Sequence, residues 1–76
     1  MTRDDVRQRL ADGVVFDTQV IANPANTREW IVFFNKDAGR SFFLVDDAEQ
    51  VQTFSSLDAL MLELRGLGIK RVGVQL

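Results

Sequence analysis

Two apolar runs that flank a short polar turn place the strongest constraint on the fold of this chain. Together with the turn, the two runs occupy residues 30–45 and read WIVFFNKDAGRSFFLV. In an extended strand, neighbouring side chains point to opposite faces. One face would carry Trp30, Val32, Phe34, Phe42 and Leu44, and the other would carry Ile31, Phe33, Phe43 and Val45. A strand that faces water on one side alternates apolar and polar residues, so these runs predict a sheet centre covered on both faces.

Further strands are expected on both sides of this hairpin. Residues 14–22 alternate as a half-buried strand does, and a turn at 23–26 leads into a second strand at 28–36. The segment Lys36-Asp37-Ala38-Gly39 suits a tight hairpin in which Gly39 takes a positive backbone angle, and the third strand follows at 40–46. A turn at 46–49, a short fourth strand at 50–54 and a last strand at 69–76 complete the pattern.

Two helices are predicted. Thr2 and Asp5 resemble a capping box at the start of a short helix over residues 3–11, and Gly13 can supply the left-handed residue that ends it. Ser55 or Ser56 can cap a second helix, which is stopped by the segment 66–68. Its apolar side chains recur at helical spacing; they are Leu57, Leu60, Met61 and Leu64.

The order of these elements, α-β-β-β-β-α-β, predicts a single small α+β domain over residues 1–76. We expect a mainly antiparallel sheet, made of a four-strand meander and the C-terminal strand, with two helices. The last strand could lie beside the first strand or at the far edge, and the sequence leaves both placements open.

Length and composition indicate how the protein is stabilised and where in the cell it is expected to work. With 76 residues, the chain is near the size at which a core can form without disulfides or metals, and it contains no cysteine. The net charge of -2 gives no strong field toward nucleic acid or an anionic membrane. No apolar run approaches the length of a membrane span, and the N-terminus resembles neither a signal nor a transit peptide, so we expect a soluble, cytoplasmic protein without membrane association.

The residue types argue against catalysis and against a bound cofactor. Histidine, cysteine and tyrosine are all absent, which removes the usual general base, thiolate nucleophile and phenolic acid. The acidic residues at 46–49 lack the spacing of a calcium loop and are typical of a solvated turn. The pair Ser55-Ser56 fits helix capping better than nucleophilic chemistry. We therefore expect a protein that is not an enzyme and that holds no cofactor and no metal.

Surplus apolar strand surface then indicates a protein-binding module. If both helices lie on one side of the sheet, the other side leaves an apolar patch of the kind that marks interaction surfaces. The candidate partner-binding residues are Trp30, Ile31, Phe33, Phe43 and Val45, with Arg28 and Arg40 at the rim. The partner could be a second copy in a homodimer, or a larger protein of which this chain is an accessory subunit or an inhibitor, such as one from a phage or mobile element. One helix on each face, or a strongly curled sheet, would instead bury both sides.

Nucleic-acid binding through the sheet face is the alternative from another class. Aromatic side chains on a sheet can stack bases, and cations such as Arg28 and Arg40 could lie near its edge. The aromatics stand among valine, isoleucine and leucine, however, and the net charge is slightly negative. The sequence therefore favours a protein partner over nucleic acid.

Overall fold

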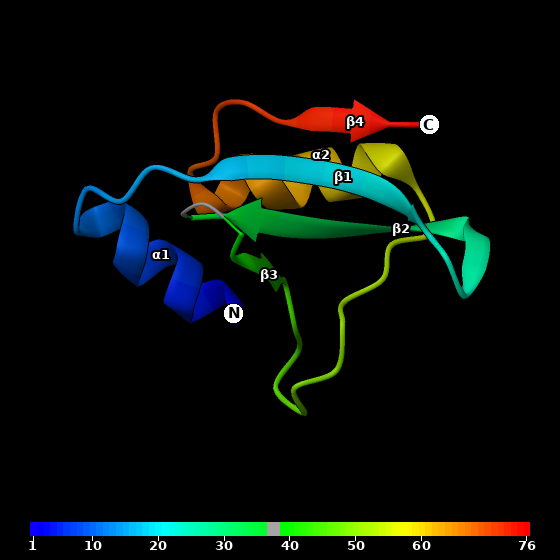
Figure 1. Ribbon diagram of the computed structural model, residues 1–76, viewed down its shortest axis with the longest axis horizontal. Coiled ribbons are helices and arrows are strands. Elements are labelled where there is room, and N and C mark those ends of the chain that lie inside the picture. The colour runs from blue at the N-terminus through cyan, green and yellow to red at the C-terminus, as the bar shows by residue number, and fades with distance from the viewer. Residues whose placement is uncertain (37–38) are drawn as a thin grey trace.

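A computed structural model describes residues 1–36 and 39–76 of the chain. Within these residues the chain forms an α+β fold with two helices and one mixed four-stranded sheet (Figure 1). The elements are, in chain order, α1 (Arg3–Ala11), β1 (Asp17–Asn23), β2 (Asn26–Asn35), β3 (Ser41–Phe43), α2 (Leu57–Leu67) and β4 (Gly73–Gln75).

The sheet has the strand order β3-β2-β1-β4. β2 is antiparallel to both β1 and β3, and β4 lies parallel to β1, as the arrows of Figure 1 show. In the central pair Val20 lies opposite Val32 and Ile21 opposite Ile31. The last strand therefore lies beside the first, which is one of the two placements that the sequence left open.

The expectation of a mainly antiparallel sheet with a four-strand meander is wrong in two respects. First, β4 pairs with β1 in parallel. Second, residues 50–54 form no ladder strand: Val51 makes an isolated bridge with Val45, and Phe54 makes another with Trp30. The two bridges join this segment to different partners, so it crosses from one to the other instead of extending a single strand pair.

Strand limits also shift from the expected ones. β1 begins only at Asp17, and Phe16 just before it packs its ring 5.4 Å from that of Phe34. β3 is short, although Leu44 still donates a backbone hydrogen bond of 3.1 Å to the carbonyl of Val32. Gly39 has the expected positive φ, at +87°. The rest of the predicted hairpin turn, residues 37 and 38, lies outside the described residues.

The prediction for α1 is confirmed at both ends. The Thr2 hydroxyl accepts from the Asp5 amide at 3.2 Å, and the Asp5 carboxylate accepts from the Thr2 amide at 3.0 Å, which completes the capping box. The hydrogen bond from the Thr2 amide, followed by a smaller contribution of the Thr2 side chain, stabilises the carboxylate and holds the pKa of Asp5 below its ordinary value. Gly13, with φ +84°, turns the chain out of the helix.

The prediction for α2 is confirmed as well. Ser56 is the N-cap, and its hydroxyl accepts from the Ala59 amide at 3.3 Å. Gly68 ends the helix in the left-handed conformation, with φ +96°. Within the described residues, neither helix is both long enough and apolar enough to cross a membrane.

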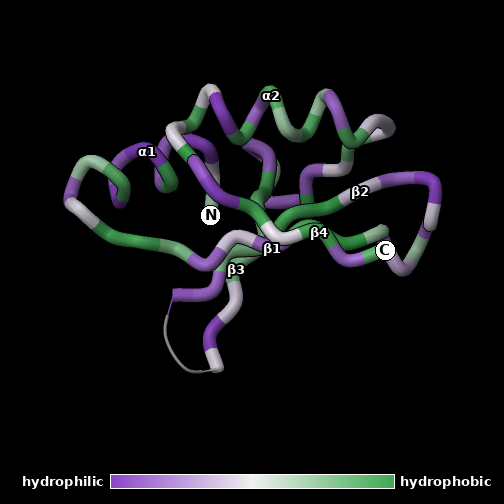
Figure 2. Tube along the Cα trace, turned by 90° about the horizontal axis from the view of Figure 1, so that it is seen from above, coloured by the Kyte–Doolittle hydropathy of each residue, from purple (hydrophilic) through white to green (hydrophobic). Residues whose placement is uncertain are grey.

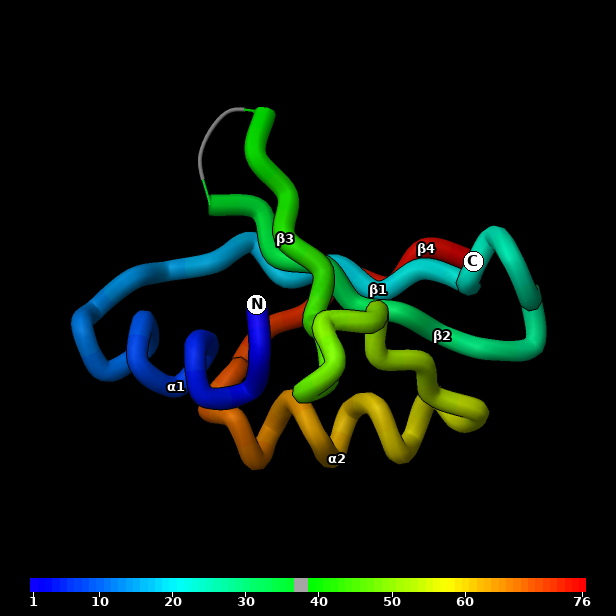
Figure 3. Tube along the Cα trace, turned by 90° about the horizontal axis from the view of Figure 1, so that it is seen from below, coloured from blue at the N-terminus to red at the C-terminus, as the bar shows by residue number. Residues whose placement is uncertain are grey.

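Both helices lie on the same side of the sheet, as the views from above and from below show (Figures 2 and 3). The core forms between this side of the sheet and the helices, and its buried side chains are Val6, Val20, Val32, Phe34, Leu44, Leu60, Leu64 and Leu67. The arrangement with one helix on each face, which the sequence had left open, is therefore not the one adopted.

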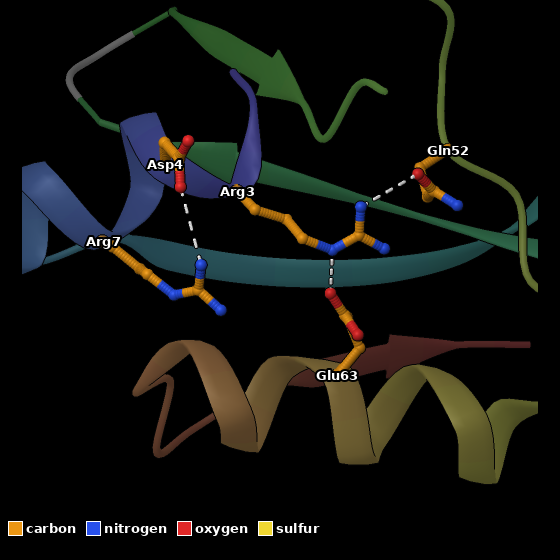
Figure 4. A network of polar contacts seen from close by, with 5 residues as sticks. All are labelled: Arg3, Asp4, Arg7, Gln52 and Glu63. Carbon is orange, nitrogen blue, oxygen red and sulfur yellow. Dashed lines mark hydrogen bonds and ion pairs between the residues drawn. The ribbon is translucent and has the colours of Figure 1, made fainter. Parts of the chain in front are cut away.

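A polar contact fixes α1 against α2 on that side (Figure 4). The guanidinium of Arg3 forms an ion pair with Glu63 of α2 and also donates to the side chain of Gln52 at 3.4 Å. Arg7 forms a second ion pair at 3.6 Å with Asp4, within α1 itself. Arg3 thus links the first helix to the second helix and to the segment that precedes it.

Candidate protein-binding face

The face of the sheet opposite the helices carries a band of apolar side chains. We call this face the open face, and its apolar band consists of Ile21, Ile31, Phe33 and Phe43. The register places Phe33 opposite Phe43 and Ile21 opposite Ile31, so the four side chains come from three adjacent strands. None of them belongs to the helix-side core or packs against it.

Exposure differs among the members of the apolar band. Ile31, at its centre, is only 5% exposed, whereas Phe43 on the edge strand is 38% exposed. The rings of Phe33 and Phe43 lie 5.8 Å apart at an interplanar angle of 59°, which is a favourable tilted aromatic pair. The band is therefore a packed layer whose most accessible member is Phe43 on β3.

One end of the apolar band is bounded by a hydrogen-bonded polar row. Asp17, Asn35 and Ser41 lie side by side on β1, β2 and β3. The amide of Asn35 donates to Asp17 at 3.3 Å, and the hydroxyl of Ser41 donates to Asn35 at 2.6 Å. Gln19 also donates to Asp17, at 2.9 Å, and its carboxamide lies where a Cβ on Gly73 of β4 would be. Gly73 therefore allows the polar side chain of Gln19 to reach over the edge strand.

A second polar cluster bounds the other end, near the β1–β2 turn. The Asn23 amide donates to Glu29 at 3.3 Å, and the Thr53 hydroxyl donates to the other carboxylate oxygen of Glu29 at 3.4 Å. Polar groups thus flank the apolar band at both ends, as in an interface with an apolar centre and a polar rim.

The structure brings three of the predicted binding residues together and separates the other four. Ile31, Phe33 and Phe43 share the open face. Trp30 is half-buried on the helix side, where it packs against the core, and its backbone pairs with Phe54. Val45 lies beyond β3, where its amide donates to the carbonyl of Met1 at 2.8 Å.

The two predicted rim cations are exposed and stand next to the two polar clusters in the sequence, but within the described residues neither side chain takes part in the hydrogen bonds of these clusters. Arg28 lies in the first part of β2, and Arg40 precedes β3, where its carbonyl accepts from the Lys36 amide at 3.3 Å. The charged groups in the two polar clusters are instead the carboxylates Asp17 and Glu29.

Ile21 is a member of the apolar band that was not among the predicted binding residues. Its signal was the alternation of β1, which places it with Gln19 and away from the core side chain of Val20. Pairing with Ile31 then brings it into the apolar band.

The acidic turn at 46–49 has a structural explanation in the fold. One oxygen of Asp46 accepts from the amides of Ala48 and Gln50, at 2.9 and 3.0 Å, and Glu49 adopts a positive φ of +62°. Asp46 therefore closes a local turn of the Asx type.

Comparison of the chain with protein-family models, with curated proteins and with solved structures finds no match.

Proposed function

We propose that this protein is a non-catalytic protein-binding module that associates through its open face, and that the partner there is a second copy of the chain. The observation that carries this proposal is the placement of both helices on one side of the sheet, which leaves the apolar band without a helix over it. Two sheets that pack face to face lie about 10 Å apart and bury such layers between them.

The chemistry of the rim favours a second copy. A two-fold interface brings the same surface together twice, so its polar groups must tolerate copies of themselves. The amides of Gln19, Asn23 and Asn35 and the hydroxyls of Ser41 and Thr53 both donate and accept hydrogen bonds, and can therefore pair with one another across such an axis.

The same rim disfavours nucleic acid at this face. Single-strand binding combines stacking aromatics with a positively charged groove. Here Phe33 and Phe43 lie between two clusters whose charged members are Asp17 and Glu29, and these carboxylates would repel phosphates. Nucleic-acid binding at this face would therefore lack the positively charged groove that attracts the phosphates.

The test compares two phenylalanines that differ in the face they occupy. Phe43 lies on the open face and Phe42 on the helix side of the same strand, and they are 38% and 37% exposed. Sedimentation equilibrium at protein concentrations from about 1 μM to about 1 mM detects dimers whose dissociation free energy lies between about 8 and about 4 kcal/mol. We expect the native chain to dimerise within this range.

Phe43→Ser should weaken the dimer at least about tenfold, or about 1.4 kcal/mol, because buried aromatics contribute most to interface energies. Phe42→Ser should leave the dimer constant nearly unchanged. Far-ultraviolet circular dichroism of both variants checks that each is folded. A native chain that remains a monomer at the highest concentration, or equal effects of the two substitutions, would contradict dimerisation through the open face.

A further inference from the structure

A different surface, on the helix side, combines apolar grooves with unpaired cations. The first groove, of about 480 Å³, runs between α2 and the segment that leads into β4. Its apolar lining includes Met61, Leu64, Ile69 and Val72, and Leu62 at its lip is 68% exposed. This groove can receive apolar side chains of a partner.

A second groove, of about 240 Å³, lies on the other side of the same segment. It is lined by Leu10, Val14 and Phe16, and Val15 at its lip is 85% exposed. Ile69, Lys70 and Arg71 line both grooves, so residues 69–71 form a ridge between them. We call this surface the basic ridge.

The charge of the basic ridge is opposite to that of the whole molecule. Arg65 joins Lys70 and Arg71 along the first groove, where Asp58 is the one acidic lining residue, while the chain as a whole carries -2. Within the part of the chain that the structure describes, none of these three cations forms an ion pair, whereas Arg3 and Arg7 both do. Three exposed cations therefore stand beside apolar grooves without a carboxylate partner of their own.

We infer that the basic ridge binds an acidic peptide segment of a partner protein, whose carboxylates contact Lys70, Arg71 and Arg65 and whose apolar side chains enter the two grooves. Successive side chains of an extended peptide point to opposite sides, so two adjacent apolar residues can enter the grooves on either side of the ridge, and acidic residues next to them can reach the cations. The surface lies on the helix side, so its occupancy does not depend on what binds the open face.

The lining of the grooves favours a peptide over a nucleic acid. Bases are held by stacking on aromatic rings. The apolar lining of the first groove consists of aliphatic side chains and Met61, and the aromatic residue of the second groove, Phe16, already packs its ring against Phe34. A nucleic acid would also bring many phosphates toward a molecule of net negative charge, whereas a short acidic peptide brings only the few charges that the ridge can pair.

The probe is a fluorescein-labelled peptide in which Leu-Leu pairs alternate with Asp-Asp pairs, measured by fluorescence polarisation with the intact chain. Its controls are the same peptide with Asn in place of Asp, and an oligothymidylate of equal charge. We expect the acidic peptide to bind at least about tenfold more tightly than either control, and its affinity to fall as salt rises. Amide shifts in nitrogen-15 spectra should centre on residues 62–72.

A matched pair of charge reversals tests the location. Lys70→Glu with Arg71→Glu should reduce peptide affinity at least about tenfold. Arg28→Glu with Lys36→Glu makes the same change in net charge away from the ridge and should retain the affinity. Circular dichroism confirms that both double variants are folded.

Three outcomes would overturn the inference. They are equal binding of the Asp and Asn peptides, equal losses in the two double variants, and tighter binding of the oligothymidylate, which would assign the ridge to nucleic acid. The dimer measurements on Phe43→Ser are separate, so failure here leaves the open-face proposal standing and failure there leaves this one standing.

Discussion

At the scale of single residues, Thr18 is the point where the core carries a polar group without compensation. Its side chain is 3% exposed on the helix side of β1, and its hydroxyl has no hydrogen-bond partner among the described residues. A buried polar group that is left unsatisfied costs about 1–3 kcal/mol. The Thr18 hydroxyl therefore lowers the stability of a core that is made of few buried residues.

Replacing that hydroxyl by a methyl group should stabilise the protein. We expect Thr18→Val to raise the free energy of unfolding in urea by about 1 kcal/mol. Thr27→Val, at an exposed position of β2, is the control and should change it by less than about 0.5 kcal/mol. A loss of stability in Thr18→Val would show that the hydroxyl has a bound water or another partner.

At the scale of elements, α2 provides the greater part of the helical surface that covers the sheet. Leu60 is fully buried, whereas Leu62, two positions along the same helix, is 68% exposed. Leu60→Ala should lower the free energy of unfolding by roughly 2–5 kcal/mol, because it removes apolar contacts and leaves a cavity. Leu62→Ala should lower it by less than about 0.5 kcal/mol. Equal effects of the two substitutions in denaturant unfolding would contradict this assignment of the helix faces.

The elements that the sequence predicts best are those with local chemistry at their ends. Thr2 and Gly13 delimit α1, and Ser56 and Gly68 delimit α2, because capping bonds and positive φ angles depend on neighbouring residues. Alternation is the same for parallel and antiparallel strands, so residues 69–76 could not reveal the direction of β4. Figure 1 shows that the chain leaves α2 near the beginning of β1, and the returning strand therefore runs in the same direction.

The candidate site was predictable in part for a related reason. Alternation groups Ile31 with Phe33, and Phe43 falls on the same face through its pairing with Phe33. Both faces of β2 are apolar, so periodicity could not say which face the helices cover. That choice comes from long-range packing of Val6 and Leu60 against Val20 and Val32, and it places Trp30 on the helix side, against the core, instead of on the open face.

At the scale of the whole molecule, dimerisation and folding should be linked. A chain that associates only when folded gains stability with concentration. Above the dimer dissociation constant, a tenfold rise in concentration adds about 0.7 kcal/mol per chain, half of the 1.4 kcal/mol that a tenfold change represents. For a domain of this size, that corresponds to a rise in Tm of roughly 3–5 °C.

Trp30 gives a direct signal for this measurement, since it is the one tryptophan of the chain and packs against the core. We expect the Tm from tryptophan fluorescence to rise with concentration in the native chain and in Phe42→Ser, and to stay constant in Phe43→Ser. If Phe43→Ser keeps the full concentration dependence, folded chains associate through a surface other than the open face. If the native Tm does not change although sedimentation detects dimers, unfolding does not require their dissociation, and the dimer contact does not depend on the folded sheet.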